Sequence, residues 1–397
     1  MSEAKVTPEW GVEHFDPWDK RITYSNVWGI YRAMRQEAPA VHSDAHGGFW
    51  SIVRYDDIKR AARDFRVFSS ALGTSIGARG ANISAPPKAP IEYDPPEHTR
   101  LRKAMQTPFL PNNVKMLAEG IRSGVNELLD GIAAKGSFDI VKDLAEPVPQ
   151  EVLARILGFD EEAKNKNREF VLAVVHAHFG SSEGAWNDFR SFLSEEIHKR
   201  QSKPGDDFFS HLCSDEFDGA RFNEAELISM LVALALAGHH TSINGISSLL
   251  RRMADKRARK AYLTDARLGP NMVEETLRCD PPIHLEARTT TASVEVSGVK
   301  IPADSQVALV YAAGNHDEVE FDHPEEFDFM RGSNQHLSFG HGIHSCSGMH
   351  LARLEMSIVL EETMKRFPGY VLAGEPIDSG LIYGHHMGWE SIPAAIE

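Results

Sequence analysis

Apolar residues recur at helical spacing along most of the chain, and the longest such segment runs from about residue 224 to about residue 253. Asn223 and Glu226 stand at its start with the three-residue separation of a capping box. Residues 227–238 are apolar on almost every face of this helix, so we expect it to be buried. With a rise of about 1.5 Å per residue, the helix is long enough to cross a domain.

Shorter elements account for the rest of the pattern. Helical spacing is found at 27–37, over most of 114–200 and from 349 onward, and strand-like alternation near 41, at 49–53 and over 281–310. Glycine and proline crowd residues 69–96, which is typical of a loop. No internal repeat or low-complexity linker divides residues 1–397, so the pattern predicts one domain, mainly α with a small β portion.

The long apolar helix is interrupted by the sequence Ala-Gly-His-His-Thr at residues 237–241. Glycine in a helix interior costs up to about 1 kcal/mol relative to alanine, and buried polar groups need partners. Such an interruption indicates a functional position. The alternative is a buried histidine that a neighbouring residue satisfies.

Cys346 lies in a glycine-rich stretch directly ahead of the last predicted helix. The N–H groups and the dipole at a helix N-terminus favour a thiolate there. Gly340, Gly342 and Gly348 remove side chains around the sulfur, so the backbone can approach a flat ligand closely. A buried free cysteine in a turn is one alternative. A zinc site is another, although its ligands lack the paired spacing of structural zinc sites: His341, His344, Cys346 and His350.

The stretch 339–348 reads Phe-Gly-x-Gly-x-His-x-Cys-x-Gly and resembles the haem-binding loop of the cytochrome P450 family. In that family the cysteine thiolate is the axial ligand of haem iron. The resemblance therefore implies that Cys346 is the metal ligand and that the cofactor is haem b, with O₂ as co-substrate. It also implies haem contacts from the rest of this loop and from the interrupted helix: Phe339, Gly340, His344, Gly348, Ala237 and Gly238.

The resemblance covers nearly the whole chain and implies the single, triangular, mainly helical P450 fold. It assigns haem propionate contacts to His98, Arg102 and Arg288. For His98 and Arg102, the alternative is a solvated charged surface. Glu275, Arg278 and Arg331 match the family's buried ionic network that holds the cysteine loop, although a Glu-x-x-Arg pair alone is common on helix surfaces. Residues 180–184, between Phe179 and Trp186, match its mobile substrate lid.

The function implied by the resemblance is that of a bacterial-type haem-thiolate monooxygenase that hydroxylates or O-dealkylates a small or medium organic substrate. A peroxide-driven peroxygenase and a non-catalytic ligand sensor are the alternatives. Candidate pocket residues follow by family position: Leu234, His284, Leu285, Glu286, His385, His386 and Met387.

One position departs from the family pattern. The residue before Thr241 is usually an acid that relays protons together with the threonine hydroxyl, and here it is His240. An imidazole can donate, accept or carry charge, so we expect His240 and Thr241 to form the catalytic pair. The alternative is that His240 turns toward the substrate and water supplies the protons.

Composition and charge indicate the cellular compartment and disfavour some classes of binding partner. A formal net charge of −15 disfavours nucleic acid and anionic membranes as partners. Three cysteines without a C-x-x-C pair fit a reducing compartment, and residues 1–16 lack the apolar core of a signal peptide, so we expect a soluble, cytoplasmic protein.

Electrons would come from a separate protein, because the chain has no G-x-G-x-x-G stretch and too few cysteines for an iron–sulfur cluster. The resemblance implies a ferredoxin-type donor with an NAD(P)H-dependent reductase. Arg100, Lys103 and Arg353 are candidates for a basic docking patch, with a solvated charged surface as the alternative.

Overall fold

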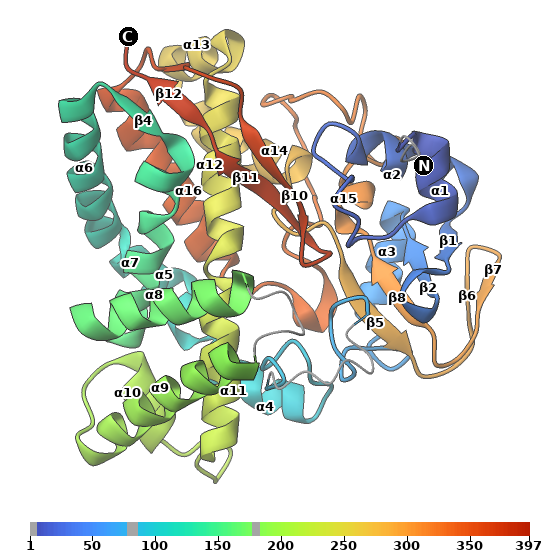
Figure 1. Cartoon of the computed structure of the whole chain (residues 1–397), viewed down its shortest axis with the longest axis horizontal. Coiled ribbons are helices and arrows are strands. Elements are labelled where there is room, and N and C mark those ends of the chain that lie inside the picture. Colours follow the sequence, from blue (N-terminus) through green and yellow to red (C-terminus); the bar gives the residue numbers. More distant parts are fainter. Residues whose placement is uncertain (1–5, 78–85, 177–182) are drawn as a thin grey trace.

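A pair of nearly continuous helices, α11 (Glu224–Ala237) and α12 (His240–Met253), runs through the middle of the molecule (Figure 1). The predicted capping box is confirmed, because Asn223 accepts from the Glu226 amide and the Glu226 side chain accepts from the Asn223 amide. Most of α11 is buried, as its apolar sequence predicts. The computed structural model describes residues 6–77, 86–176 and 183–397.

The helices α5–α10, α13 and α16 lie to the left in Figure 1, and α1, α2, α3 and α15 lie to the right; the bounds of all the remaining helices follow. They are α1 (Pro8–His14), α2 (Val27–Glu37), α3 (Tyr55–Arg63), α4 (Glu97–Met105), α5 (Pro111–Met116), α6 (Ala118–Lys135), α7 (Pro147–Leu157), α8 (Glu161–His176), α9 (Glu183–Ser202), α10 (Phe208–Ser214), α13 (Lys256–Thr264), α14 (Gly269–Cys279), α15 (Tyr311–Asn315) and α16 (Met349–Arg366).

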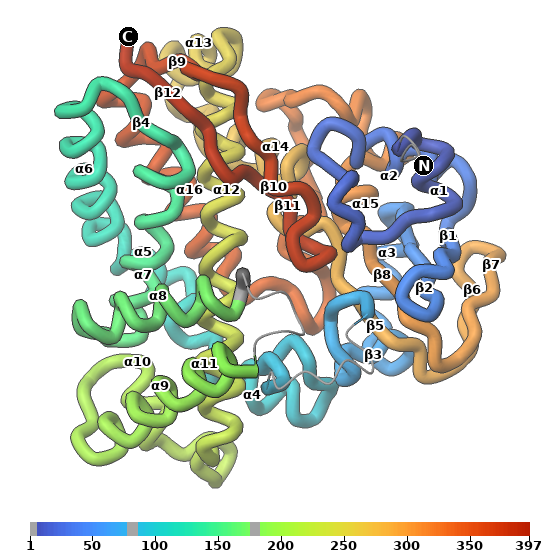
Figure 2. Tube along the Cα trace, viewed as in Figure 1, coloured from blue at the N-terminus to red at the C-terminus, as the bar shows by residue number. Residues whose placement is uncertain are grey.

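The largest sheet has five strands in the order β1-β2-β8-β5-β3 and lies with α1, α2 and α3 on the other side of the molecule (Figures 1 and 2). Only the β2–β8 pair in it is parallel. Its strands are β1 (Ala40–Ser43), β2 (Phe49–Ile52), β8 (Gln306–Leu309), β5 (Glu286–Thr290) and β3 (Phe68–Ser69). The smaller sheets consist of β10 (Ile377–Ile382) with β11 (His386–Ser391), of β4 (Ser137–Asp139), β12 (Pro393–Ala395) and β9 (Val371–Leu372), and of β6 (Val294–Val296) with β7 (Val299–Ile301).

Three packing relationships position the site. Helix α16, which follows the cysteine loop, packs along α12; the β10–β11 hairpin also contacts α12; and the short turn Gly342–His344 in the cysteine loop contacts α3. The loop, the helix interruption and the hairpin therefore converge from distant parts of the sequence.

The segment Glu224–Met253 is the one stretch of the described chain that is long and apolar enough to cross a membrane, and 56% of its most apolar window is buried inside the protein. Packing in the interior accounts for its composition. The prediction of a mainly helical fold with a small β portion is confirmed, and the described parts of 69–96 form turns and coil after β3. Residues 180–182 of the predicted lid lie outside the described residues, whereas Glu183 and Gly184 belong to α9 and Trp186 is buried in this helix.

Candidate functional site

Cys346 lies three residues before α16, in a loop shaped by two glycines. Gly340 and Gly342 have φ of +66° and +75°, the left-handed region that side chains disfavour. The Cys346 amide donates to the Phe339 carbonyl at 2.8 Å, which closes the loop. The Cys346 side chain is exposed, although it is held within a folded loop.

Electrostatic effects on the Cys346 thiol oppose one another. The protein atoms around the sulfur raise the pKa of the thiol by burial. The Gly348 amide and the positive charges of Arg102 and Arg353 act in the opposite direction and favour the thiolate. A Cβ atom added to Gly348 would lie 3.8 Å from the sulfur. The glycine therefore leaves the space beside the sulfur open. Burial is the larger effect, so the pKa of the thiol is raised overall, and the Gly348 amide and the two arginines offset part of this rise.

His98 and His344 meet next to this loop, with ring centroids 4.6 Å apart and nearly perpendicular rings. The His344 Nε2 atom lies 3.1 Å from the Ser70 hydroxyl, whereas both ring nitrogens of His98 are buried with no hydrogen-bond partner. Burial lowers the pKa of His98, and the charge of Arg102 adds to this effect. Burial, Arg288 and His98 lower the pKa of His344 to about 2. Both rings are therefore neutral hydrogen-bonding groups at pH 7.

Arg102 and Arg288 complete this cluster. Arg102 is half-buried and Arg288 is 3% exposed. Neither guanidinium forms an ion pair with a carboxylate in the described parts of the chain, and Arg288 donates only to the carbonyl of Ala287. Two arginines and two histidines without a counter-anion fit an anionic ligand, and haem propionate carboxylates have this chemistry.

The zinc alternative finds no support. Across residues 6–77, 86–176 and 183–397, no group of three or more His, Cys, Asp or Glu side chains is arranged to hold a metal ion. His341 instead lies 2.6 Å from the Arg63 Nε atom, and His344 faces Ser70.

The interruption of the long helix lies between α11 and α12. The Thr241 hydroxyl donates to the Ala237 carbonyl at 2.6 Å. Ala237 is exposed and Gly238 is half-buried, although both belong to a mainly buried helix pair. This part of the helix therefore presents small residues and a hydroxyl, as contact with a flat cofactor requires.

Sequence comparisons agree with this geometry. The family model for Cytochrome P450 matches residues 267–378. Cyclomarin C epoxidase CymV of Salinispora arenicola is 33% identical over 87% of this chain and 90% of that protein. The chain belongs to the cytochrome P450 family.

Two further relatives show how far the similarity extends. Erythromycin C-12 hydroxylase of Saccharopolyspora erythraea is 35% identical over 84% of this chain and 85% of that protein. The solved structure of the cytochrome P450 PksS of the bacillaene polyketide synthase from Bacillus subtilis 168 has a TM-score of 0.85 at 28% identity, covering 96% of this chain and 100% of that chain. This P450 is therefore an oxidoreductase of the monooxygenase class that uses haem iron and O₂.

In this P450, four aromatic side chains gather beside Thr241. The His240 ring centroid lies 6.1 Å from those of Tyr383 and His386, and the His385 and His386 rings are 4.4 Å apart. Burial and the charge of Lys88 lower the pKa of His385 to about 3, and burial with His385 holds the pKa of His386 well below its usual value. The hairpin therefore presents neutral imidazoles to the helix interruption.

Three of the predicted pocket residues have side chains that pack in the interior. Leu285 and Met387 are buried in the hydrophobic cluster around α2 and the large sheet. The His284 Nδ1 atom lies 3.1 Å from the Tyr31 hydroxyl, and its ring packs against Trp28. We do not retain these three as substrate contacts, because their side chains are committed to interior packing.

Glu286, His385, His386 and Leu234 remain candidates for the pocket. Glu286 is 9% exposed, and its Oε2 atom has no hydrogen-bond partner. Burial raises the pKa of Glu286, and the charges of Lys88 and Arg288 oppose this effect. Leu234 is buried on α11, one turn before the interruption.

The predicted ionic network is present and fully buried at its centre. Arg278 donates to both carboxylate oxygens of Glu275 at 2.9 and 2.8 Å, and Arg331 reaches the same carboxylate at 3.2 Å. Arg278 also donates to the carbonyls of Asn315, Pro324 and Glu326. The network therefore ties α14 to the segment that leads into the cysteine loop.

Two polar residues near the site escaped the sequence argument. Asn334 donates to Glu275 at 2.9 Å, and nothing in its sequence context indicates this contact. Glu355 of α16 is 2% exposed and accepts from the Ser242 hydroxyl at 2.9 Å. Burial raises the pKa of Glu355 to about 7. An acid among the apolar positions of α16 was the available signal.

The predicted basic patch is wrong. Arg100 pairs with Glu226 at 2.5 Å and Lys103 with Asp218 at 2.7 Å, whereas Arg353 pairs with Glu274 at 2.6 Å. Each charge is neutralised by a carboxylate from a distant segment, so the three cations do not form one unpaired basic surface.

Proposed function

We propose that this P450 holds haem b through the Cys346 thiolate and inserts one atom of O₂ into a small or medium organic substrate by hydroxylation or O-dealkylation. The observation that carries the proposal is the cluster of His98, Arg102, Arg288 and His344 beside the cysteine loop, in which neither arginine forms an ion pair with a carboxylate of the described residues. A thiolate-ligated haem activates O₂ and promotes cleavage of its O–O bond.

Each residue of the site then has a specific task. The cluster of two arginines and two histidines would bind the propionates, and Ala237 and Gly238 would leave room for the haem beside the long helix. Phe339, Gly340 and Gly348 shape the loop that would supply the sulfur ligand. Glu275, Arg278 and Arg331 keep that loop in place from behind.

His240 and Thr241 together deliver the protons for the reaction. The Thr241 hydroxyl is oriented by the Ala237 carbonyl, and an imidazole next to it can take up a proton at one nitrogen and release one from the other. Glu355 of α16 accepts a hydrogen bond from the hydroxyl of Ser242, the residue that follows Thr241. Its carboxyl group has a pKa of about 7 and is a further store of protons.

The substrate is recognised by a polar wall made of Glu286, His385 and His386. Each has a buried polar atom without a partner, which suits a substrate that carries hydroxyl or carbonyl groups. Relatives named as an epoxidase and a hydroxylase support oxygen insertion as the reaction. A screen for compounds that shift the haem spectrum from low spin to high spin tests the substrate class.

Electrons come from a ferredoxin-type protein with an NAD(P)H-dependent reductase, and the chain works as one soluble, cytoplasmic domain without nucleic-acid or membrane partners. Turnover with NAD(P)H and a redox-partner pair, but not with hydrogen peroxide alone, is the expected result. Turnover with peroxide alone would identify a peroxygenase. Binding of substrates without turnover by either route would identify a ligand sensor.

The central test is spectroscopic. The reduced carbon monoxide complex of the purified protein should show the strongly red-shifted Soret band of a thiolate-ligated haem, and Cys346→His should abolish the shift. A wild-type spectrum like that of a histidine-ligated haem would exclude Cys346 as the ligand.

A further inference from the structure

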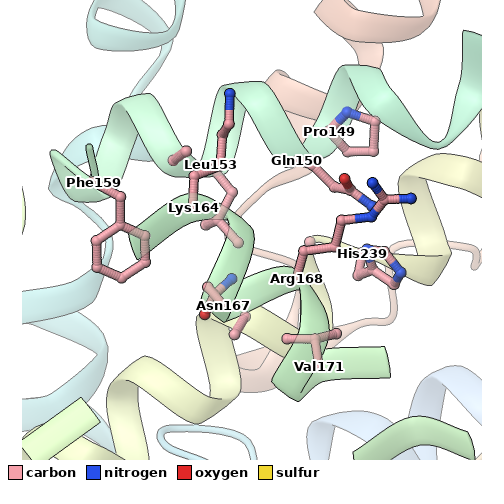
Figure 3. A pocket seen from close by; sticks show the side chains of 12 residues that line it. Pro149, Gln150, Leu153, Phe159, Lys164, Asn167, Arg168, Val171 and His239 are labelled. Atoms are coloured by element: carbon pink, nitrogen blue, oxygen red, sulfur yellow. The ribbon is translucent and has the colours of Figure 1, made fainter. Parts of the chain in front are cut away.

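A small cavity lies behind the interruption between α11 and α12 (Figure 3). It has about 20 Å³ of free space, which suits roughly one water molecule. Residues of α7, α8 and the interruption line it, among them Gln150, Asn167, Arg168, Gly238 and His239. None of the residues assigned above to substrate or proton transfer lines this cavity.

Asn167 brings an unsatisfied polar atom to the cavity. Its side chain lines the space, the residue is 9% exposed, and its Oδ1 atom is buried without a hydrogen-bond partner. Leaving such an oxygen unpaired costs about 1–3 kcal/mol. A water molecule in the cavity would donate to this oxygen and remove the cost.

The helix interruption supplies a second polar group. A regular α-helix would join the His239 amide to the Ala235 carbonyl, but that amide donates to the Leu236 carbonyl at 3.4 Å instead. His239, whose amide makes this irregular bond, lines the cavity itself. A water in the cavity therefore meets Asn167 on α8 and the imidazole of His239 at the interrupted helix.

His239 links the cavity to the site. It lines the cavity, is 5% exposed, and Figure 3 shows its ring beside Gln150 and Arg168. On the other side, its ring centroid lies 4.7 Å from that of His240, with the two rings nearly perpendicular. An imidazole has two nitrogens and can therefore connect a water on one side with a second histidine on the other.

The outer wall of the cavity reaches solvent. Arg168 is exposed and pairs with Glu146 at 2.7 Å, while the half-buried Lys164 pairs with Glu151 at 2.9 Å and Glu161 at 2.7 Å. These ion-paired side chains lie at the surface, and the solvent beside them is the source of protons.

We propose that this cavity binds one water molecule and that His239 passes solvent protons from that water to His240. The inference rests on the proposed role of His240 in proton delivery. His239 accepts a proton from the water at one ring nitrogen and releases one to His240 from the other, and solvent replaces the proton that the water gives up. Neither histidine gains net charge over a complete cycle.

The water site is tested without turnover. A crystal structure of the haem-containing protein should show an ordered water about 3 Å from Asn167 Oδ1. Asn167→Leu removes the acceptor and should remove the water, whereas Asn165→Leu, the same change at an exposed position of α8, should retain it. A dry cavity in the wild type would overturn the proposal.

The relay is tested by coupling. His239→Phe should lower product formed per NAD(P)H consumed at least threefold and increase peroxide release, and His239→Gln, which keeps a polar group of smaller size, is the second variant. If the two histidines act in series, His239→Phe combined with His240→Ala should be no worse than the more severe single variant. Losses that multiply, or unchanged coupling in both His239 variants, would contradict the relay.

These outcomes are separable from a failure of the proposed function. The red-shifted carbon monoxide band and the substrate-induced spin shift should stay intact in every variant at position 239, because the sulfur ligand and the proposed substrate residues are unchanged in these variants. A protein without the red-shifted band would fail the proposed function itself.

Discussion

Gly342 lies so close to α3 that a Cβ atom added to it would come within 2.4 Å of the Ala62 carbonyl oxygen. Its φ of +75° also disfavours any side chain. Gly342→Ala should therefore displace the cysteine loop from α3 and destabilise the haem-bound protein by about 2 kcal/mol. Thermal denaturation and the haem-to-protein ratio after gel filtration measure this effect.

Gly332→Ala is the matched control, because nothing lies within 4 Å of a Cβ atom at that position and its φ is not positive. It should leave the melting temperature and the haem content unchanged. Equal behaviour of the two variants would show that the contact with Ala62 does not hold the loop.

The buried network around Arg278 gives the second prediction. Arg278→Lys keeps the charge but cannot serve Glu275 and the carbonyls of Asn315, Pro324 and Glu326 together, since lysine lacks the planar fork. We expect a loss of about 3–5 kcal/mol in the free energy of unfolding, measured with denaturant. Arg267→Lys, at an exposed pair with Asp265, should leave the free energy of unfolding close to that of the wild type.

The cysteine loop and the ionic network could be predicted from the sequence because each matches a short pattern of the cytochrome P450 family. Gly340, Gly342 and Cys346 lie within ten residues of one another, and the resemblance of this stretch, rather than its spacing alone, implies a loop that holds a thiolate. The structure adds that Gly342 is required by its contact with α3, which lies some 280 residues earlier in the chain.

The pocket could not be predicted equally well. Side chains alternate along β5 and the segment before it, so Leu285 and Ala287 face a hydrophobic cluster while Glu286 and Arg288 face the other way. The sequence does not reveal which set faces the haem. Ion pairs such as Arg100 with Glu226, 126 residues apart, also follow from tertiary packing rather than from local pattern.

Glu355 gives a pH-dependent prediction. Burial raises its pKa from 4.5 to about 7, so the folded protein favours the protonated form. The stability that this preference contributes is present below about pH 4.5 and is lost as the pH rises through 7. Glu355→Gln lacks this loss and should gain stability relative to the wild type between pH 5 and pH 8, by on the order of 3 kcal/mol.

Melting temperatures of both proteins across this pH range measure the effect, and the difference between them should grow by a few degrees. Glu375→Gln, at an exposed position, is the control and should show no such trend. A constant difference between wild type and Glu355→Gln would mean that Glu355 is ionised throughout the range.

The last prediction concerns His240, which precedes Thr241 in the chain, where the family usually has an acid, and whose ring lies near that of His386. If His240 relays protons, His240→Ala should lower product per NAD(P)H severalfold and raise peroxide release, while the substrate-induced spin shift stays intact. His240→Asp should restore much of the coupling, because a carboxylate at this position can also pass protons.

His386→Phe is the matched variant, since His386 borders the same cluster and is proposed to contact substrate. It should weaken the spin-shift affinity and leave the coupling of bound substrate close to wild type. The opposite pattern, with full coupling and weak binding in His240→Ala, would assign His240 to substrate recognition and leave water as the proton donor to Thr241.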